Sequence, residues 1–356
     1  MQNTPDGRTP LSTYDTPVEQ GVRTTVPPRA GRRSSVRLFG LVLAIVALIA
    51  VAVLSIGFGA RFLSPGEVWA GLWDPDSPYY RIVHEMRLPR TLLGLMVGMA
   101  LGLAGAIMQA LTRNPLADPG LLGINAGASA AVATAAVFFG VGTFFGYVWF
   151  ALAGAAIVTA LVYAVGGGRS ATPARLALAG AALNATLLSY VSAVLLSDTQ
   201  AIDKMKFWTA GSLASADFAT VERLLPFFAV GLLTGLLVAG PLNALSLGDD
   251  SARALGANPS VIRAAVIVAV TLLCGSATAA CGPIVFIGLL IPHMVRPFTG
   301  PDLRWLLPYT AILAPVLLLG ADVLGRILGS PGELQVGTVT AVLGGPLFLY
   351  LVRAAK

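Results

Sequence analysis

Long runs without charged residues dominate the chain. Nine such runs follow one another at 38–58, 91–112, 119–140, 145–168, 176–197, 224–247, 264–295, 305–321 and 334–352. A hydrocarbon core of ~30 Å needs about 20 apolar residues in a helix that rises 1.5 Å per residue. Most of the runs have this length, so the pattern predicts helices that cross a membrane.

The seventh run, residues 264–295, is too long for a single span. Cys281, Gly282 and Pro283 stand in its middle. Proline has no N–H to donate to the helix, and glycine loosens the backbone beside it. We therefore expect two helices here, the second of them short, which brings the number of predicted spans to ten.

The distribution of basic residues supports ten spans. With the N-terminus inside, 15 of the 23 lysines and arginines fall on the inner side of the membrane. Nine spans would invert the last loops and move basic residues to the outer side, against the positive-inside rule. The sequence predicts an all-α polytopic membrane protein of about ten transmembrane helices, in the cytoplasmic membrane, with both termini cytoplasmic.

The first 36 residues differ from the rest of the chain. They contain five prolines and many serines and threonines, with almost no large apolar side chain. Such a segment buries too little surface to offset its ordering entropy. We expect residues 1–36 to be a disordered cytoplasmic tail and residues 37–356 to form the membrane domain. A signal peptide is the alternative, but the run 38–58 exceeds the usual apolar core of about 7–15 residues.

Composition excludes a soluble enzyme. Hydrophobic residues make up 56% of the chain and charged residues 11%, against about 25% charged in soluble domains. The net charge of +6 comes from residues in the tail and between the apolar runs, which indicates membrane topology and not a nucleic-acid partner.

The residues of common catalytic sites are missing from the sequence. No G-x-x-x-x-G-K-[ST] phosphate loop is present, and two histidines and two cysteines are too few for a metal cluster of either kind. We therefore expect no catalytic residue, no bound metal and no cofactor on this chain.

Ionisable residues are also scarce within the spans. Asp322 and Arg326 stand four residues apart near the outer end of the ninth predicted helix, a spacing that suits an ion pair. Carriers driven by protons or sodium place acidic groups or histidines at mid-membrane. A transporter without them needs an energised partner. An ion-coupled secondary carrier and a channel-like or scaffolding protein remain as alternatives.

The longest predicted cytoplasmic connection is residues 247–259. Asp249 or Ser251 can cap a short helix there, and Gly256 can end it. A short helix parallel to the membrane offers a surface that a motor protein can push. An ordinary connector is the alternative.

Several short motifs stand in order from about residue 60 to the C-terminus. They are Arg87-Leu88-Pro89-Arg90, Asn114 to Pro119, Leu121 to Ala128, Trp208 with Gly211-Ser212-Leu213, Ala252-Arg253-x-Leu255-Gly256, Gly282 to Gly288, Pro292-His293, and Asp322 to Gly344. Together they resemble the FecCD-type permeases, which are the membrane subunits of bacterial ABC importers for iron-siderophores, haem and vitamin B12.

The resemblance implies a type II importer subunit with inverted repeats of four helices each, placed after the first and sixth spans. It also implies a second permease subunit, identical or related, and separate ATP-binding cassette subunits that hold ATP and Mg. An extracytoplasmic substrate-binding protein completes the set of partners. An iron(III)-siderophore is the first expectation for the cargo, with cobalamin or haem as alternatives.

The resemblance also suggests roles for individual residues. The ATPase-coupling loop is similar at Gly248, Asp249, Asp250, Ser251, Ala252, Arg253, Leu255 and Gly256. Arg87, Arg90 and Arg326 match arginines that bind acidic residues of the substrate-binding protein, and guanidinium–carboxylate pairs suit that task. Interfacial anchoring is the alternative for these arginines, as is a pair with Asp322 for Arg326.

Two further segments have expected roles. Thr172, Pro173 and Ala174, in the connection 170–175, resemble a loop that closes the inner mouth of the passage, although a simple turn suits them as well. The motif residues around the start of the third helix are expected to be structural, with Asn114 and Asp118 as caps. The motif consists of Asn114, Pro115, Asp118 and Pro119.

Overall fold

The computed structural model describes residues 30–59, 61–141, 144–168, 172–198, 205–206 and 208–354, without the side chains of 30–35, 144–145, 351–352 and 354. All regular structure in these ranges is helical. The first 29 residues of the predicted tail and residues 170 and 171 of the predicted gate loop lie outside the described residues, so the expectations about them stay predictions.

Each of the ten predicted spans contains one helix. These helices are α1 (Ala30–Gly57), α3 (Leu88–Thr112), α4 (Ile124–Phe138), α5 (Phe144–Val165), α6 (Pro173–Leu196), α8 (Phe218–Ser246), α10 (Pro259–Cys281), α11 (Ile287–Thr299), α12 (Leu303–Leu328) and α13 (Val336–Ala354). In the described part of the chain, seven helices are long and apolar enough to cross a membrane, while α4, α11 and α13 are shorter. The predicted all-helical polytopic fold is confirmed.

The first helix begins earlier than expected. Residues 30–36 belong to α1, and they are not part of a disordered tail as the boundary at residue 37 implied. The last proline of the tail is Pro28, so no residue after it prevents the helix from extending toward the N-terminus.

The predicted break in the seventh run lies where the sequence placed it. α10 ends at Cys281, and Gly282 has a φ of +73°. A Cβ atom on Gly282 would lie 1.8 Å from the Trp208 carbonyl oxygen, so only glycine fits. The Ser212 amide donates to the Cys281 carbonyl at 2.7 Å, which satisfies a group that the broken helix leaves free.

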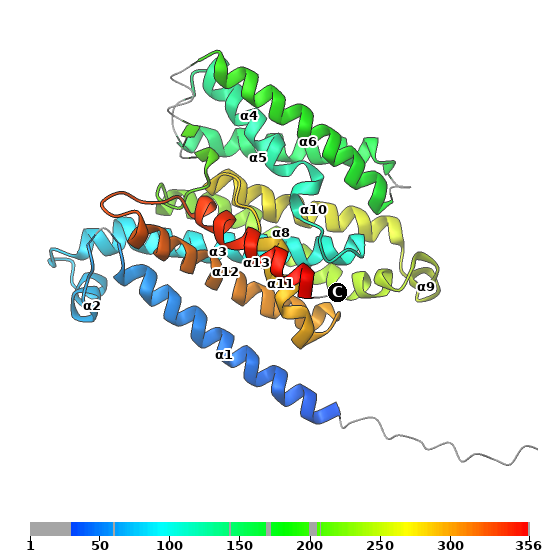
Figure 1. Cartoon of the computed structure of the whole chain (residues 1–356), viewed down its shortest axis with the longest axis horizontal. Coiled ribbons are helices and arrows are strands. Elements are labelled where there is room, and N and C mark those ends of the chain that lie inside the picture. Colours follow the sequence, from blue (N-terminus) through cyan, green and yellow to red (C-terminus); the bar gives the residue numbers. More distant parts are fainter. Residues whose placement is uncertain are drawn as a thin grey trace, which may run out of the picture.

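Short elements connect the long helices. They are α2 (Pro65–Trp73), a π-helix η1 (Ile82–Arg87) that continues into α3, a 3-10 helix η2 (Pro119–Leu122) and α9 (Asp249–Ala254). Figure 1 shows α2 and α9 at opposite ends of the molecule. A capping box of Ser64 and Glu67 starts α2. Hydrogen bonds from the Tyr79 hydroxyl and the Ser64 amide lower the pKa of the Glu67 carboxyl.

The central helix is α3, which packs against α12, α10, α8 and α11. Its most apolar stretch is 78% buried, whereas those of α1 and α6 are 11% and 17% buried. α1 and the group of α4, α5 and α6 lie on opposite sides of this centre (Figure 1). α1 and α6 therefore present most of their surface to the surroundings of the chain.

Glycines let α3 approach its neighbours closely. Gly98 lies against the backbone of Pro315 in α12. A Cβ atom on Gly105 would lie 1.8 Å from the Gly288 carbonyl oxygen at the start of α11. The two backbones are in contact at this point, and no side chain fits between them.

We expect Gly105→Ala to destabilise the protein, because the added methyl group forces α3 and α11 apart. The loss is about 3 kcal/mol, at the upper end for overpacked cores, and appears as a lower melting temperature in detergent. Gly240→Ala in α8 is the matched control, since no atom lies within 4 Å of its new Cβ. Equal melting temperatures for the two variants would contradict this account of the packing.

Candidate functional site

The predicted coupling loop contains a short helix, α9, and Gly256 follows it with a φ of +78°. This part of the prediction is confirmed. The predicted cap is wrong: Gly248 is the N-cap residue, and no side chain caps the helix. Asp249 is the first helical residue instead, and its carboxylate binds arginines of other segments.

One face of α9 is exposed to solvent. Asp250 is fully exposed, Arg253 is 62% exposed, and the two side chains form an ion pair at 2.9 Å. Leu255 adjoins them and is 68% exposed. Ala252 is buried against the rest of the chain. α9 thus presents a mixed charged and apolar surface, with Ser251 and Gly256 also exposed beside it.

The arginines expected to dock a binding protein lie at the opposite end and are largely buried. Arg87 is 6% exposed, Arg326 is 3% exposed, and the side chain of Arg90 is 12% exposed. Arg87 and Arg326 therefore offer little surface to a protein partner in this conformation, and their docking role stays a prediction. In this conformation their hydrogen bonds are internal.

Arg87 and Arg326 hold the C-terminal end of α1. Arg87 donates to the carbonyls of Ile56 and Gly57 at 2.6 and 2.7 Å, and also to that of Arg61. Arg326 donates to the carbonyls of Ser55 and Phe58 at 2.9 and 2.6 Å. Carbonyls at a helix end have no partner within the helix, and a cation there also interacts favourably with the helix dipole.

Asp322 joins these arginines into one network. Its carboxylate accepts from Arg326 at 2.6 Å, as the four-residue spacing suggested, and from Nη2 and Nε of Arg90 at 2.7 and 3.1 Å. Arg90 also binds Glu333 at 2.8 Å. The carboxylate of Asp322 is 1% exposed, so two cations compensate a buried anion between α3 and α12.

The motif between α3 and α4 shapes their connection. The Asn114 side chain accepts from the Leu116 amide at 2.9 Å, and Pro115 occupies the turn between them. Asp118 accepts from the Gly120 amide at 2.7 Å and caps η2, whose first residue is the buried Pro119. Asp118 is therefore a cap, as predicted, but it caps η2 and not α4, which has no side-chain cap.

The described part of the predicted gate loop begins α6. Thr172 accepts from the Arg175 amide at 3.4 Å, and Pro173 is the first helical residue. Thr172 and Ala174 are exposed. The segment is thus a helix start that leaves its small side chains accessible, and a closing role for it stays a prediction.

A pocket of about 390 Å³ lies beside α4 and α6. Its polar groups are Asp118, Asn125, Ser129 and Asn184, and the extended segment after α10 closes it with Pro283 and Val285. Asn125 accepts from Thr278 of α10 at 2.8 Å. Asn125 and Asn184 were not among the predicted site residues, although a polar amide within an apolar run is a signal of a functional site in a membrane protein.

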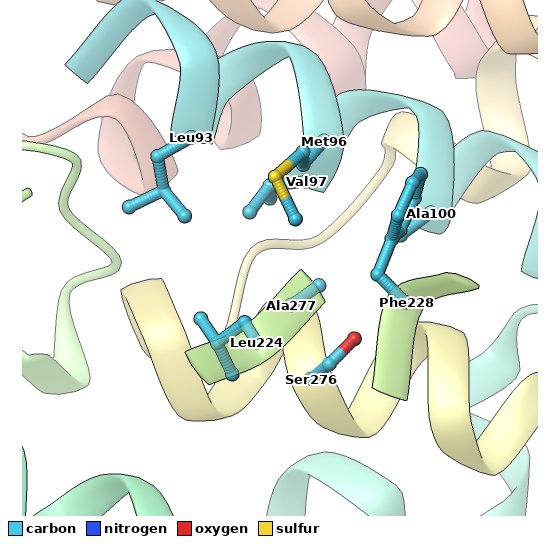
Figure 2. Close-up of a pocket in the computed structure, with 8 residues that line it drawn as sticks. All are labelled: Leu93, Met96, Val97, Ala100, Leu224, Phe228, Ser276 and Ala277. Carbon is cyan, nitrogen blue, oxygen red and sulfur yellow. The ribbon is translucent and has the colours of Figure 1, made fainter. Parts of the chain in front are cut away.

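The centre of the helix bundle offers much less room. Figure 2 shows the side chains of Leu93, Met96 and Val97 of α3 facing Leu224 and Phe228 of α8. The pocket between them holds about 10 Å³, which is the space of a single water molecule. A large cargo therefore does not fit between α3 and α8 in this conformation.

Neither cysteine forms part of a metal site in the structure. Cys274 and Cys281 are free and buried. In the part of the chain that the structure describes, no group of three histidine, cysteine, aspartate or glutamate side chains could hold a metal ion.

Helices apolar enough to cross a membrane, a pocket that carries four polar groups among apolar walls, and an exposed short helix at one end are the features expected of a membrane transport subunit. The model of the FecCD transport family matches residues 47–354. The chain therefore belongs to this family. It is the permease subunit of an ABC importer, in which the ATPase is a separate protein.

Individual relatives and one solved structure agree with this assignment. The chain is 46% identical to the ferric enterobactin permease FepD of Escherichia coli, over 86% of this chain and 92% of FepD. It is 38% identical to the Fe(3+)-citrate permease YfmD of Bacillus subtilis, over 92% and 98% of the two chains. An inward-facing metal-chelate type ABC transporter is similar in structure, with a TM-score of 0.76, 30% identity, and coverage of 90% of this chain and 99% of that one.

We expect Asp322→Asn to destabilise the permease strongly, because it removes the carboxylate that the buried Arg326 shares with Arg90, and only Arg90 keeps a second one, that of Glu333. Breaking a buried ion pair from one side costs about 3–5 kcal/mol, measured here as a lower unfolding midpoint in detergent. Glu85→Gln is the control: Glu85 pairs with Arg81 at an exposed site, where an ion pair contributes at most about 1 kcal/mol. Similar midpoints for both variants would show that the network is not structural.

Proposed function

We propose that this chain is the permease through which a bacterial ABC importer moves a ferric chelate inward, with an iron(III)-siderophore as the cargo. The observation that carries this proposal is the 46% identity to a ferric enterobactin permease over nearly the full length of both chains. The cargo named for the relative from Bacillus subtilis is also Fe(3+) held by an organic chelator. Haem and cobalamin are the competing cargoes that the transport experiment below distinguishes.

The exposed face of α6 supports a passage that a second permease subunit completes. α1 exposes an apolar surface, as expected of a helix in lipid, and its Ser55 is buried. α6 instead carries exposed Thr186, Ser189 and Ser192, and its Asn184 lines the 390 Å³ pocket. Polar groups of this kind in a membrane helix mark a transport pathway or a protein neighbour. We infer that the α6 faces of two permease subunits, identical or related, enclose the passage.

We also infer the orientation of the chain and the places of its partners. The end with α9 faces the cytoplasm, as the distribution of basic residues indicates, and both termini lie on that side. The exposed surface of α9 then contacts the ATPase, which holds ATP and Mg. The substrate-binding protein docks at the opposite end, near α2, and closure of the ATPase pair moves α9 and opens the passage.

Reconstitution tests the proposed function directly. The permease is placed in liposomes with its ATPase and its binding protein, and uptake of ferric enterobactin, ferric citrate, haemin and cobalamin is measured. We expect ATP-dependent uptake of a ferric siderophore, and none without the ATPase. Uptake by the permease alone under a proton or sodium gradient would contradict an ATP-driven importer. Uptake of only haemin or cobalamin would contradict the proposed cargo.

We expect Arg253→Glu to weaken docking of the ATPase, because it reverses a charge on the exposed face of α9. Loss of one charge-assisted contact corresponds to about a tenfold decrease in uptake rate. Co-purification with the ATPase and uptake into liposomes measure the effect. Arg81→Glu is the matched control for co-purification with the ATPase, since Arg81 is 82% exposed at the other end of the molecule. Wild-type uptake by the Arg253 variant would argue against a docking role for α9.

A further inference from the structure

The carboxylate of Asp249, the first residue of α9, binds two arginines from other segments. One nitrogen of Arg263 donates to both carboxylate oxygens, at 2.8 and 2.9 Å. Arg113 reaches one of these oxygens at 3.5 Å. The side chains of Arg263, Asp249 and Arg113 are 14%, 32% and 46% exposed. The contact between Asp249 and Arg263 is therefore partly shielded from water, where charge-assisted hydrogen bonds are strong.

These arginines belong to two of the most buried helices. Arg263 lies in the first turns of α10, whose apolar stretch is 72% buried. Arg113 ends α3 in the left-handed conformation, with a φ of 52°. Arg113 also donates to the Leu245 carbonyl at 2.6 Å, in the last turn of α8. Asp249 is thus tied to α10 directly and to α3 through Arg113, just after α8 ends.

The remaining charged residues of α9 are arranged differently. Asp250 and Arg253 pair with each other on the exposed face of the same helix. Ala252 is buried but presents only a methyl group to the rest of the chain. A small apolar contact slides easily, whereas an ion pair with hydrogen bonds fixes both distance and direction. Asp249 is therefore suited to carry a displacement of α9 into the membrane helices.

α10 connects this ion pair to the 390 Å³ pocket beside α4 and α6. It is 23 residues long, its single proline is the first residue, and so it contains no proline kink. It ends at Cys281, and the next segment contributes Pro283 and Val285 to the 390 Å³ pocket. α3 passes the same region, where Gly105 touches Gly288. If the ends of α10 and α3 next to α9 move, the movement is therefore transmitted along these two stiff helices to the pocket.

We propose that Asp249 is the positioning residue that transmits the movement of α9 to α10 and α3, through its ion pairs with Arg263 and Arg113. This inference rests on the proposed function, in which the ATPase bears on the exposed face of α9. Asp249 itself faces the permease helices. Its loss affects the transport of cargo per ATP hydrolysed more than the binding of the ATPase.

The test uses the full importer in liposomes with its binding protein and ferric enterobactin. ATP hydrolysis and uptake are measured together for wild type, Asp249→Asn, Arg263→Gln and the double variant. We expect both single variants to keep their hydrolysis rate while uptake per ATP falls about tenfold, within the range of typical coupling between sites. The double variant is expected to be no worse than either single one, because the two residues act as one unit.

Two further variants separate transmission from docking and folding. Asp249→Glu keeps the carboxylate and is expected to retain most of the coupling. Arg304→Gln removes an exposed charge from the first turn of α12, outside α9, and is expected to leave uptake per ATP unchanged. Co-purification with the ATPase and the melting temperature are measured for every variant, and both are expected to match the wild type.

Several outcomes would overturn the inference. Unchanged uptake per ATP in Asp249→Asn would show that the ion pair transmits nothing. Loss of ATPase co-purification in that variant would place the carboxylate in the docking surface. Additive losses in the double variant would show that the two residues act independently. Failure of the wild-type complex to couple ATP to uptake would instead refute the proposed function, so the two failures are distinguishable.

Discussion

The hydrocarbon of a bilayer supplies no water, so each backbone N–H and C=O within it needs a partner in the protein. Helices meet this demand along their length but not at their ends. At the C-terminal end of α1, the guanidinium groups of Arg87 and Arg326 donate to carbonyls of the last turn. At the end of α10, the Ser212 amide donates a hydrogen bond to the carbonyl of Cys281. The same demand explains why charged residues occur at the rim of an otherwise apolar domain.

The two ends of the molecule meet this demand with different rigidity. At the α2 end, Asp322 and its arginines are almost fully buried and connect α1, α3 and α12. Breaking that network leaves several buried charges without a partner at once, so the helices there are held together as one rigid body. At the α9 end, a six-residue helix is attached through Ala252 and the carboxylate of Asp249. Movement is therefore easier at the α9 end, where we propose that the ATPase acts.

Apolar length and breaker residues predict most of the fold, because the bilayer imposes them on the sequence. The nine runs, and the break at Gly282 that divides one of them into two spans, follow from apolar length and breaker residues. The partners of the arginines do not, since Arg90 binds Asp322 at a separation of 232 residues. Sequence analysis assigned the outer arginines to a protein partner because their internal acceptors are mostly backbone carbonyls, which no motif records. It found the α9 loop but assigned Asp249 to a cap, since the distant arginines that bind it were not visible in a local pattern.

The walls of the 390 Å³ pocket suit the passage that we propose for the cargo. They combine small and apolar residues with two amides, a serine and one carboxylate that already accepts a backbone N–H. Such walls offer few strong contacts, and a transport pathway needs weak contacts so that cargo can leave as readily as it enters. The volume of about 390 Å³ lies at the lower end for ligand pockets, which fits one half of a passage between two subunits. In the proposed function, selection of the chelate belongs mainly to the binding protein, and the permease contributes a shape that its partners open and close.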